Sequence, residues 1–272
     1  MKHFFGTAAS RTWALAPSPI DGSGSPASAT APHTHPVESA ALHAHLQDLS
    51  LHLTALAEST PLSLAAELFR MEPWLADALD SDRDAGVFAH WGHSTAVDEN
   101  VGLAVLASPV LNALALRAGL PASAPASNAG LLHVYGYLYA PVMTPYGTKR
   151  ERWIDAELAD ALGVPPTHFR PADGASTPLA RLTEILLPLF SGGPRRGDLL
   201  RLREQITPTL AAHTLLYRAR PGSATPAALA YALEDAHGLR LITAFPYAGS
   251  AGELCTVHVS APPRLRYNAL AA

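Results

Sequence analysis

The chain has 272 residues and a formal net charge of −4, from 19 lysine and arginine residues against 23 aspartate and glutamate residues. This acidic balance disfavours nucleic acid and anionic membranes as partners, because both are bound through basic surfaces. The single cysteine, Cys255, excludes an intramolecular disulfide framework and any zinc site built on two thiolates of this chain.

Apolar stretches stay short throughout the sequence. None approaches the roughly 18 residues that a membrane-spanning helix needs, and the first residues do not form a signal peptide. Lysine occurs only at Lys2 and Lys149, while alanine, proline and leucine are abundant, which is typical of a GC-rich bacterial genome. We therefore expect a bacterial, cytoplasmic protein without a membrane partner.

The composition along the chain indicates two regions. Residues 1–36 are expected to hold one strand, ending at about Ala16, and a flexible linker rich in proline, serine, glycine, alanine and threonine. Residues 37–272 are expected to form a single domain, with a helical part over residues 37–120 and a sheet-containing part over residues 130–272. Leucines spaced alternately by four and three share one helical face and predict the first helix: Leu42, Leu46, Leu49, Leu53 and Leu56.

Three later helices are predicted to begin at threonine-proline pairs. Threonine caps the free N–H groups of a first turn, and proline fits that turn because its missing N–H needs no partner there. The pairs are Thr60-Pro61, Thr177-Pro178 and Thr225-Pro226. Glycine is common in the left-handed position that ends a helix, and it predicts helix ends at Gly119, Gly163 and Gly238.

Strand candidates lie in the second half of the chain, at residues 130–140, 213–220, 239–245 and 254–260. The helix expected from Thr225 separates the second candidate from the third, and a short turn separates the third from the fourth. These elements predict an α+β fold. In it, a helix-rich N-terminal half packs on a mainly antiparallel sheet formed largely by the C-terminal half.

The first of these strand candidates has an unusual pattern. Side chains alternate between the two faces of a strand, so one face would carry His133, Tyr135, Tyr137 and Tyr139. An imidazole and three phenols give a ligand pocket both its shape and a few directed hydrogen bonds. The alternative is that aromatic residues simply favour strands, with their hydroxyl groups reaching water at the sheet edge.

A basic turn follows this segment. It contains Tyr146, Lys149, Arg150 and Arg152, and it precedes a predicted helix. Cations at a helix entrance oppose the helix dipole, so we expect a bound anion among them, gripped as phosphate or carboxylate by lysine and arginine side chains. The alternative is a solvated turn whose charge is partly neutralised by Glu151.

Histidines offer further candidates. His90 and His93 precede Asp98 and Glu99, but their spacing does not match the helical two-histidine zinc motif, and we predict no metal. Asp98 is equally well explained as the cap of a helix beginning near Val101. One imidazole near neutral pKa suffices for general acid–base work, so His90 and His93 are kept as catalytic candidates.

The last strand candidate adds a polar strip of its own. Thr256, His258 and Ser260 would share one face there, and this strip could border the same cavity as the tyrosine strand. His258 is therefore included among the expected substrate-binding residues.

The sequence lacks the motifs of a nucleophile elbow, a phosphate-binding loop and a dinucleotide fingerprint. The residues instead suggest an enzyme that needs no cofactor and acts on a small anionic metabolite as a lyase, isomerase or hydrolase. The expected catalytic residues are His133, Tyr137, His93 and His90. The expected substrate-binding residues are Tyr135, Tyr139, Tyr146, Lys149, Arg150, Arg152 and His258.

Two other functions remain open. The same tyrosines and arginines could recognise a small molecule or a protein partner without transforming it, since both residue types are enriched in binding hot spots. A ribonuclease-like domain could use His213, Arg218, Thr243 and His258. The acidic balance of the chain argues against RNA as its substrate.

Overall fold

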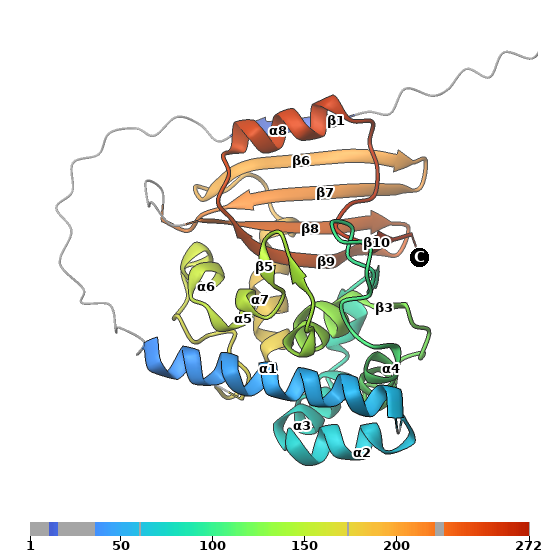
Figure 1. Cartoon of the computed structure of the whole chain (residues 1–272). Coiled ribbons are helices and arrows are strands. Elements are labelled where there is room, and N and C mark those ends of the chain that lie inside the picture. The colour runs from blue at the N-terminus through green and yellow to red at the C-terminus, as the bar shows by residue number, and fades with distance from the viewer. Residues whose placement is uncertain (1–10, 16–35, 60, 173, 221–225, 272) are drawn as a thin grey trace, which may run out of the picture.

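The computed structural model of the protein describes residues 11–15, 36–59, 61–172, 174–220 and 226–271 (Figure 1). Nearly all of the linker expected up to residue 36 lies outside these residues. So do Thr60 and Thr225, the expected caps of two helices. Within the described ranges, no helix is long and apolar enough to cross a membrane.

The helices confirm the predicted leucine stripe of the first helix and the predicted threonine cap at Thr177. In chain order they are α1 (Pro36–Ser59), α2 (Pro61–Met71), α3 (Pro73–Asp84), η1 (Val87–His90), α4 (Ser108–Arg117), η2 (Leu131–Tyr135), η3 (Gly136–Tyr139), α5 (Glu151–Ile154), α6 (Glu157–Leu162), α7 (Pro178–Ser191) and α8 (Ala251–Ser260). The leucine stripe of α1 is confirmed, with Leu46, Leu49 and Leu53 buried. The predicted cap of α7 is confirmed as well, because the Thr177 hydroxyl accepts a hydrogen bond from the backbone N–H of Ala180 at 3.0 Å.

Within the described residues, ten strands form three sheets. They are β1 (Arg11–Leu15), β2 (His93–Thr95), β3 (Ala126–Asn128), β4 (Met143–Thr144), β5 (Gly147–Thr148), β6 (Asp198–Thr207), β7 (Leu210–Tyr217), β8 (Ala227–Asp235), β9 (Gly238–Tyr247) and β10 (Ala269–Leu270). The main sheet has the order β1-β6-β7-β8-β9 and is antiparallel throughout. Helices dominate the N-terminal half and this sheet dominates the C-terminal half, so the predicted α+β fold is confirmed.

The helical half is joined to the sheet along β9, as Figure 1 shows. The backbone N–H of Gly92 donates to the carbonyl oxygen of Leu241 at 2.8 Å, which satisfies part of an edge strand that would otherwise be unpaired. A side chain at Gly92 would force Ile242 to move, because its Cβ would lie 2.8 Å from Cδ1 of Ile242. Helix α8 covers one face of the sheet near β6, where Leu254 packs with Leu200.

Residues 261–268, which we call the return segment, lead from α8 back towards the helical half. Arg266 is buried, and its Nη2 lies 3.4 Å from Oε1 of Glu204 on β6. The chain then enters β10, which pairs with β2 so that Ala269 lies opposite Ser94. This route places residues 267 and 268 beside β2, although the two segments are far apart in the sequence.

The strand predicted over residues 130–140 is wrong, because this segment forms the short helices η2 and η3. The Asn128 side chain oxygen accepts from the backbone N–H groups of Gly130 and Leu131 and so starts the helical turn. Every residue from 131 to 139 is buried, so the segment has no solvent-exposed face from which the helical period of its sequence could be recognised. A short, fully buried run does not distinguish strand from helix by pattern alone.

Other local predictions also failed, each for an identifiable reason. Residues 254–260 belong to helix α8, which a capping box between Ser250 and Glu253 initiates. The helix expected from Thr225 is strand β8, and Gly238 ends no helix but turns the chain from β8 into β9, with φ of 108°. Strand β6 was not predicted, although leucines and arginines alternate along it.

The helix expected near Val101 is absent. Residues 99–102 instead form a turn in which Oδ1 of Asp98 accepts hydrogen bonds from the backbone N–H groups of Asn100 and Val101, at 2.8 and 3.2 Å. Aspartate often caps turns in this way, so the capping role was correct and the element that follows was not.

Candidate functional site

A cavity of about 580 Å³ lies where the helical half meets β8 and β9. Its walls come from the turn at residues 98–100, the η2–η3 segment, the β4–β5 hairpin, α5, α6 and the return segment. Its lining residues are Asp98, Glu99, Asn100, His133, Tyr137, Thr144, Tyr146, Thr148, Lys149, Glu151, Arg152, Asp155, Glu157, Leu229, Thr243, Phe245, Pro246, Tyr247, Ala248, Gly249, Tyr267 and Asn268. The volume falls within the range typical of small-molecule sites.

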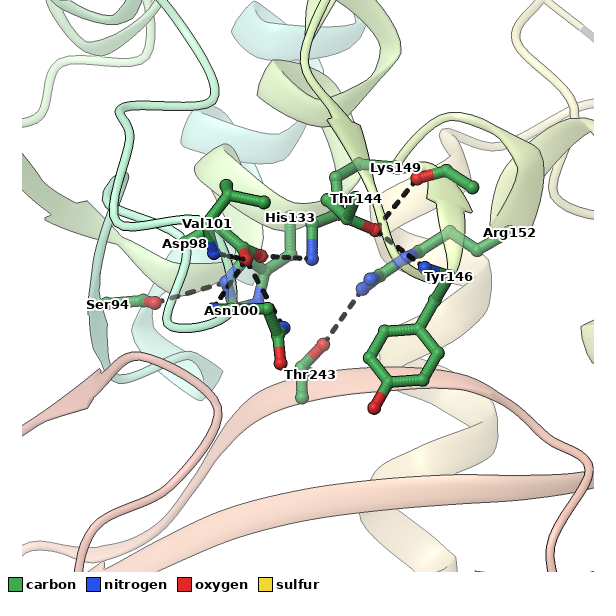
Figure 2. A network of polar contacts seen from close by, with 11 residues as sticks. Ser94, Asp98, Asn100, Val101, His133, Thr144, Tyr146, Lys149, Arg152 and Thr243 are labelled. Carbon is green, nitrogen blue, oxygen red and sulfur yellow. Dashed lines mark hydrogen bonds and ion pairs between the residues drawn. The ribbon is translucent and has the colours of Figure 1, made fainter.

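His133 lies at the inner end, and both of its ring nitrogens have hydrogen-bond partners, of which Figure 2 shows Ser94. Nδ1 lies 2.6 Å from the carbonyl oxygen of Ile242, which can only accept, so Nδ1 carries the proton. Nε2 lies 3.1 Å from the hydroxyl of Ser94. Burial, with the Arg152 charge second, lowers the pKa of His133 to about 3, so the ring is neutral. A neutral imidazole with both nitrogens occupied is poorly suited to accept a proton from a ligand.

The Ser94–His133 contact does not make a nucleophile. Ser94 is fully buried and is not part of the cavity lining. Its hydroxyl also lies 3.0 Å from the carbonyl oxygen of Asn268, so one proton serves two neighbouring acceptors. The arrangement instead ties η2 and the return segment to β2.

Tyr137 lies beside His133, with ring centroids 4.8 Å apart. Its ring also faces two cations, at 5.7 Å from Nζ of Lys149 and 5.0 Å from Cζ of Arg152. Burial raises the pKa of Tyr137 to about 12, although the Arg152 charge opposes this. The hydroxyl is therefore protonated at neutral pH and can donate a hydrogen bond to a ligand.

Asp98 and Lys149 form a buried ion pair, with Oδ2 and Nζ 2.5 Å apart (Figure 2). Burial alone would raise the pKa of Asp98, but hydrogen bonds from Lys149 and the Asn100 backbone outweigh it and lower that pKa below its ordinary value. Burial and the adjacent Arg152 lower the pKa of Lys149. Because the two opposite charges are in direct contact, each largely cancels the other.

Arg152 has a different environment. Its Nη1 donates to the hydroxyl of Thr243 at 3.1 Å, and its guanidinium lies 5.0 to 5.9 Å from the ring centroids of Tyr137, Trp153 and Phe245. No carboxylate of the described chain lies within 4.0 Å of it. Burial lowers the pKa of Arg152, but an arginine stays charged at neutral pH. Among the described residues, the cavity therefore contains one cation without a carboxylate in contact, although the field of Asp98 reaches it.

The mouth of the cavity is acidic and aromatic. Glu99 and Glu157 are exposed, as is Asp155, which contacts His43 at 3.0 Å. Tyr146 projects from the tip of the β4–β5 hairpin with 81% of its surface exposed. This tip is tightly built, because Gly147 has φ of 84° and a Cβ there would lie 2.0 Å from Oε2 of Glu151.

Four of the predicted site residues share this cavity with Tyr146: His133, Tyr137, Lys149 and Arg152. Tyr135 and Tyr139 are buried elsewhere, on the other side of the η2–η3 segment. The Tyr135 hydroxyl donates to the buried carboxylate of Asp82, and burial raises the pKa of both tyrosines well above the ordinary value.

Arg150, His258, His90 and His93 also lie outside the cavity. Arg150 is buried, and its Nη2 donates to the carbonyl oxygen of Ala140 at 2.8 Å. His258 is on α8 and is buried against the sheet, with Nδ1 2.8 Å from Oε2 of Glu204 on β6. His90 and His93 are exposed. The described part of the chain contains no group of three or more histidine, cysteine, aspartate or glutamate residues arranged to hold a metal ion.

The residues considered for a ribonuclease do not converge. Nε2 of His213 lies 2.8 Å from Oε2 of Glu234. In the pairing of β6 with β7, His213 lies opposite Arg203, and its neighbour Ala212 lies opposite Glu204. Neighbouring residues of a strand point to opposite faces, so His213 and the His258–Glu204 pair are on opposite faces of the sheet. Thr243 belongs to the cavity described above.

Sequence reasoning missed several residues of the cavity. Asp98 was considered as a cap or a metal ligand, not as the partner of Lys149. Phe245, Tyr267 and Asn268 carried no local signal, because they come from strand β9 and the return segment. Tyr267 and Asn268 have positive backbone φ angles of 56° and 64°. Such angles are uncommon outside glycine and are frequent near binding sites.

No protein-family model, curated protein sequence or solved structure matches the chain. The function is therefore inferred from the cavity.

Proposed function

We propose that the cavity binds a small organic anion, with Arg152 as the main contact. The observation that carries this proposal is the state of that guanidinium. It lies among aromatic rings with one hydroxyl partner and with no carboxylate of the described chain within 4.0 Å. A partly buried charge without a counter-ion in contact is costly, and a ligand carboxylate would lower that cost through two parallel hydrogen bonds.

The neighbouring groups support an anion at this point. The protonated Tyr137 hydroxyl and the Thr243 hydroxyl offer neutral hydrogen-bonding groups, and Lys149 adds a cation whose charge Asp98 largely cancels. Phe245 and Tyr267 give an aromatic wall on the sheet side, with ring centroids 5.4 Å apart. Polar groups at one end and an apolar wall along the side are the usual composition of a small-molecule site.

Binding can be tested with straight-chain carboxylates of two to six carbons, phenylacetate and inorganic phosphate, by isothermal titration calorimetry. Arg152→Met keeps an apolar stem and removes the charge, so we expect carboxylate affinity to fall by about 30-fold or more, the equivalent of roughly 2 kcal/mol. Arg196→Met, at an exposed arginine, is the matched control and should bind as the wild type does. If no carboxylate binds, or if Arg152→Met binds unchanged, the proposal is wrong.

A cofactor-independent enzyme is the second candidate, and the observation in its favour concerns Lys149. This amine faces the cavity with 13% of its side chain exposed, and its pKa is lowered by burial and by Arg152. An amine of lowered pKa beside a carboxylate can exchange a proton with a bound ligand, as lyase, isomerase or hydrolase chemistry requires.

The two candidates separate on turnover. We would incubate the tightest-binding anion with the protein and follow its NMR spectrum over hours, with Lys149→Ala as the comparison. Consumption of the anion by the wild type and not by Lys149→Ala would favour the enzyme. An unchanged spectrum with intact binding would favour recognition without reaction.

A further inference from the structure

The cavity has opposite charges at its two ends, and this polarity extends the proposed anion site to a class of ligand. Five carboxylates and two cations line the cavity: Asp98, Glu99, Glu151, Asp155 and Glu157, with Lys149 and Arg152. Asp98 forms an ion pair with Lys149, so the inner end retains a single positive charge, that of Arg152. Of the other four, Glu99, Asp155 and Glu157 are exposed at the mouth, whereas Glu151 accepts hydrogen bonds from Thr148.

The single net charge at the inner end limits what can bind there. One guanidinium balances one negative charge, as on a carboxylate. A second negative charge on the ligand would have no counter-ion inside and would meet the acidic mouth on its way in. Like charges brought together in a partly desolvated site destabilise the complex. The inner end is therefore suited to a monoanion rather than to a doubly ionised phosphate or a dicarboxylate.

The charges at the mouth reach the interior. The field of Glu99 raises the pKa of Lys149, after the larger effects of burial, Arg152 and Asp98, and also that of Tyr267. Glu99 lies in the turn that comes after β2, whereas Glu157 begins helix α6. Carboxylates thus approach the mouth from two separate elements. Tyr146 and Tyr247, which line the same cavity, offer ring faces that also attract cations.

The geometry points to a zwitterionic ligand of the amino-acid class, bound with its carboxylate on Arg152 at the inner end and its ammonium group among the carboxylates and tyrosines of the mouth. This inference rests on the proposed anion site and specifies its occupant. It predicts that simple carboxylates and dianions bind more weakly than a zwitterion of matched length.

Matched probes test the inference. For each chain length from two to six carbons, calorimetry compares the ω-amino carboxylate (glycine to 6-aminohexanoate) with the carboxylate that lacks the amine. Dicarboxylates and alkylamines of the same lengths complete the set. We expect an ω-amino carboxylate to bind about three- to ten-fold more tightly than its matched carboxylate, the size of effect that one or two exposed ion pairs give. Dicarboxylates and amines should bind more weakly than either.

A pair of double variants locates the effect. Glu99→Gln/Glu157→Gln should remove the preference for the amine while carboxylate binding persists. Asp48→Asn/Glu58→Gln changes the net charge equally at exposed positions of α1 and should leave the preference unchanged. Both doubles are surface changes, and thermal melting checks that each remains folded.

The outcomes separate the two proposals. If carboxylates bind in an Arg152-dependent way and the amine brings no gain, or the gain survives Glu99→Gln/Glu157→Gln, the zwitterion inference is overturned and the anion site stands. If no probe binds, or Arg152→Met binds all of them unchanged, both are overturned.

Discussion

Replacing Asp98 with asparagine isolates one charge at the inner end of the cavity. Asparagine retains the oxygen that accepts hydrogen bonds from the backbone N–H groups of Asn100 and Val101, so the turn can persist. Lys149 loses its carboxylate partner and is left 13% exposed, next to Arg152. The variant therefore leaves a buried cation without its counter-ion and keeps the loop around it.

The expected loss of stability follows from this geometry. Removing one partner of a buried ion pair costs about 3–5 kcal/mol, and the partial access of Lys149 to water places this pair near the lower end. For a domain of this size each kcal/mol lowers the melting temperature by roughly 2–4 °C, so Asp98→Asn should melt about 6–12 °C lower. The double variant Asp98→Asn/Lys149→Met should recover part of the loss, because no charge is then stranded.

Urea unfolding followed by the fluorescence of the four tryptophans measures these free energies at pH 7. Asp48→Asn, at an exposed position, is the control and should stay within about 0.5 kcal/mol of the wild type. Because Asp98 has a lower pKa when folded, its contribution is present above the unfolded pKa near 4 and is lost as the pH falls through the folded value. A loss below about 1 kcal/mol, or strictly additive single variants, would refute the reasoning.

Three further predictions follow from the cavity. His133 has a pKa of about 3 in the folded protein against about 6.5 in the unfolded chain, so the stability of the wild type should fall by on the order of 1 kcal/mol per pH unit below pH 6.5. His133→Gln should flatten this dependence in urea titrations at several pH values. An NMR titration of the ring near pH 6.5 would contradict the prediction. Gly147→Ala should lower the free energy of unfolding by about 1–3 kcal/mol and weaken carboxylate binding, because the backbone there is left-handed and Glu151 lies where the new methyl group would be. The control is Gly193→Ala, whose Cβ would have nothing within 4 Å. Equal melting temperatures of the two variants would count against the tight hairpin. Tyr137→Phe should weaken carboxylate binding about two- to ten-fold in calorimetry with little change in melting, and full affinity would remove its hydroxyl from the proposed contacts.

Part of the site could be predicted because of a coincidence of periods. Residues four apart share a face in a strand, where the period is two, and also in a helix, where it is about 3.6. His133 and Tyr137 therefore stay together although the segment is helical. Tyr135 and Tyr139 lie two residues from Tyr137, which keeps them on its face in a strand and moves them away in a helix.

Two residues of the basic turn, Lys149 and Arg152, reach the cavity of His133 and Tyr137 because a short hairpin joins the turn to the tyrosine segment. Lys149 and Arg152 are three residues apart on adjoining turns, so their convergence is local. Arg150, between them, necessarily points elsewhere, and it is buried against α1 with Nη2 3.1 Å from Ser50. Asp98 and Thr243 reach the cavity through tertiary packing, for which one sequence contains no periodic signal.

The main sheet was only half predicted because its strands compete with other signals. In β8, alanines and leucines suit a helix as well as a strand, and burial on both faces decides the outcome. In α8, the β-branched Val257 and Val259 suggest a strand, whereas the capping box at Ser250 favours a helix. Local preference was overruled by packing in the first case and by capping in the second.

The return segment has a consequence for how the protein acquires its cavity during synthesis. Ser94 and Asn268 meet across 174 positions of the chain, and Tyr267 is part of the same wall. A ribosome adding roughly 5–20 residues per second needs about 10–35 seconds to make the stretch between them. During that interval the inner end of the cavity lacks its wall, so a nascent chain that has already folded its helices cannot yet hold a ligand.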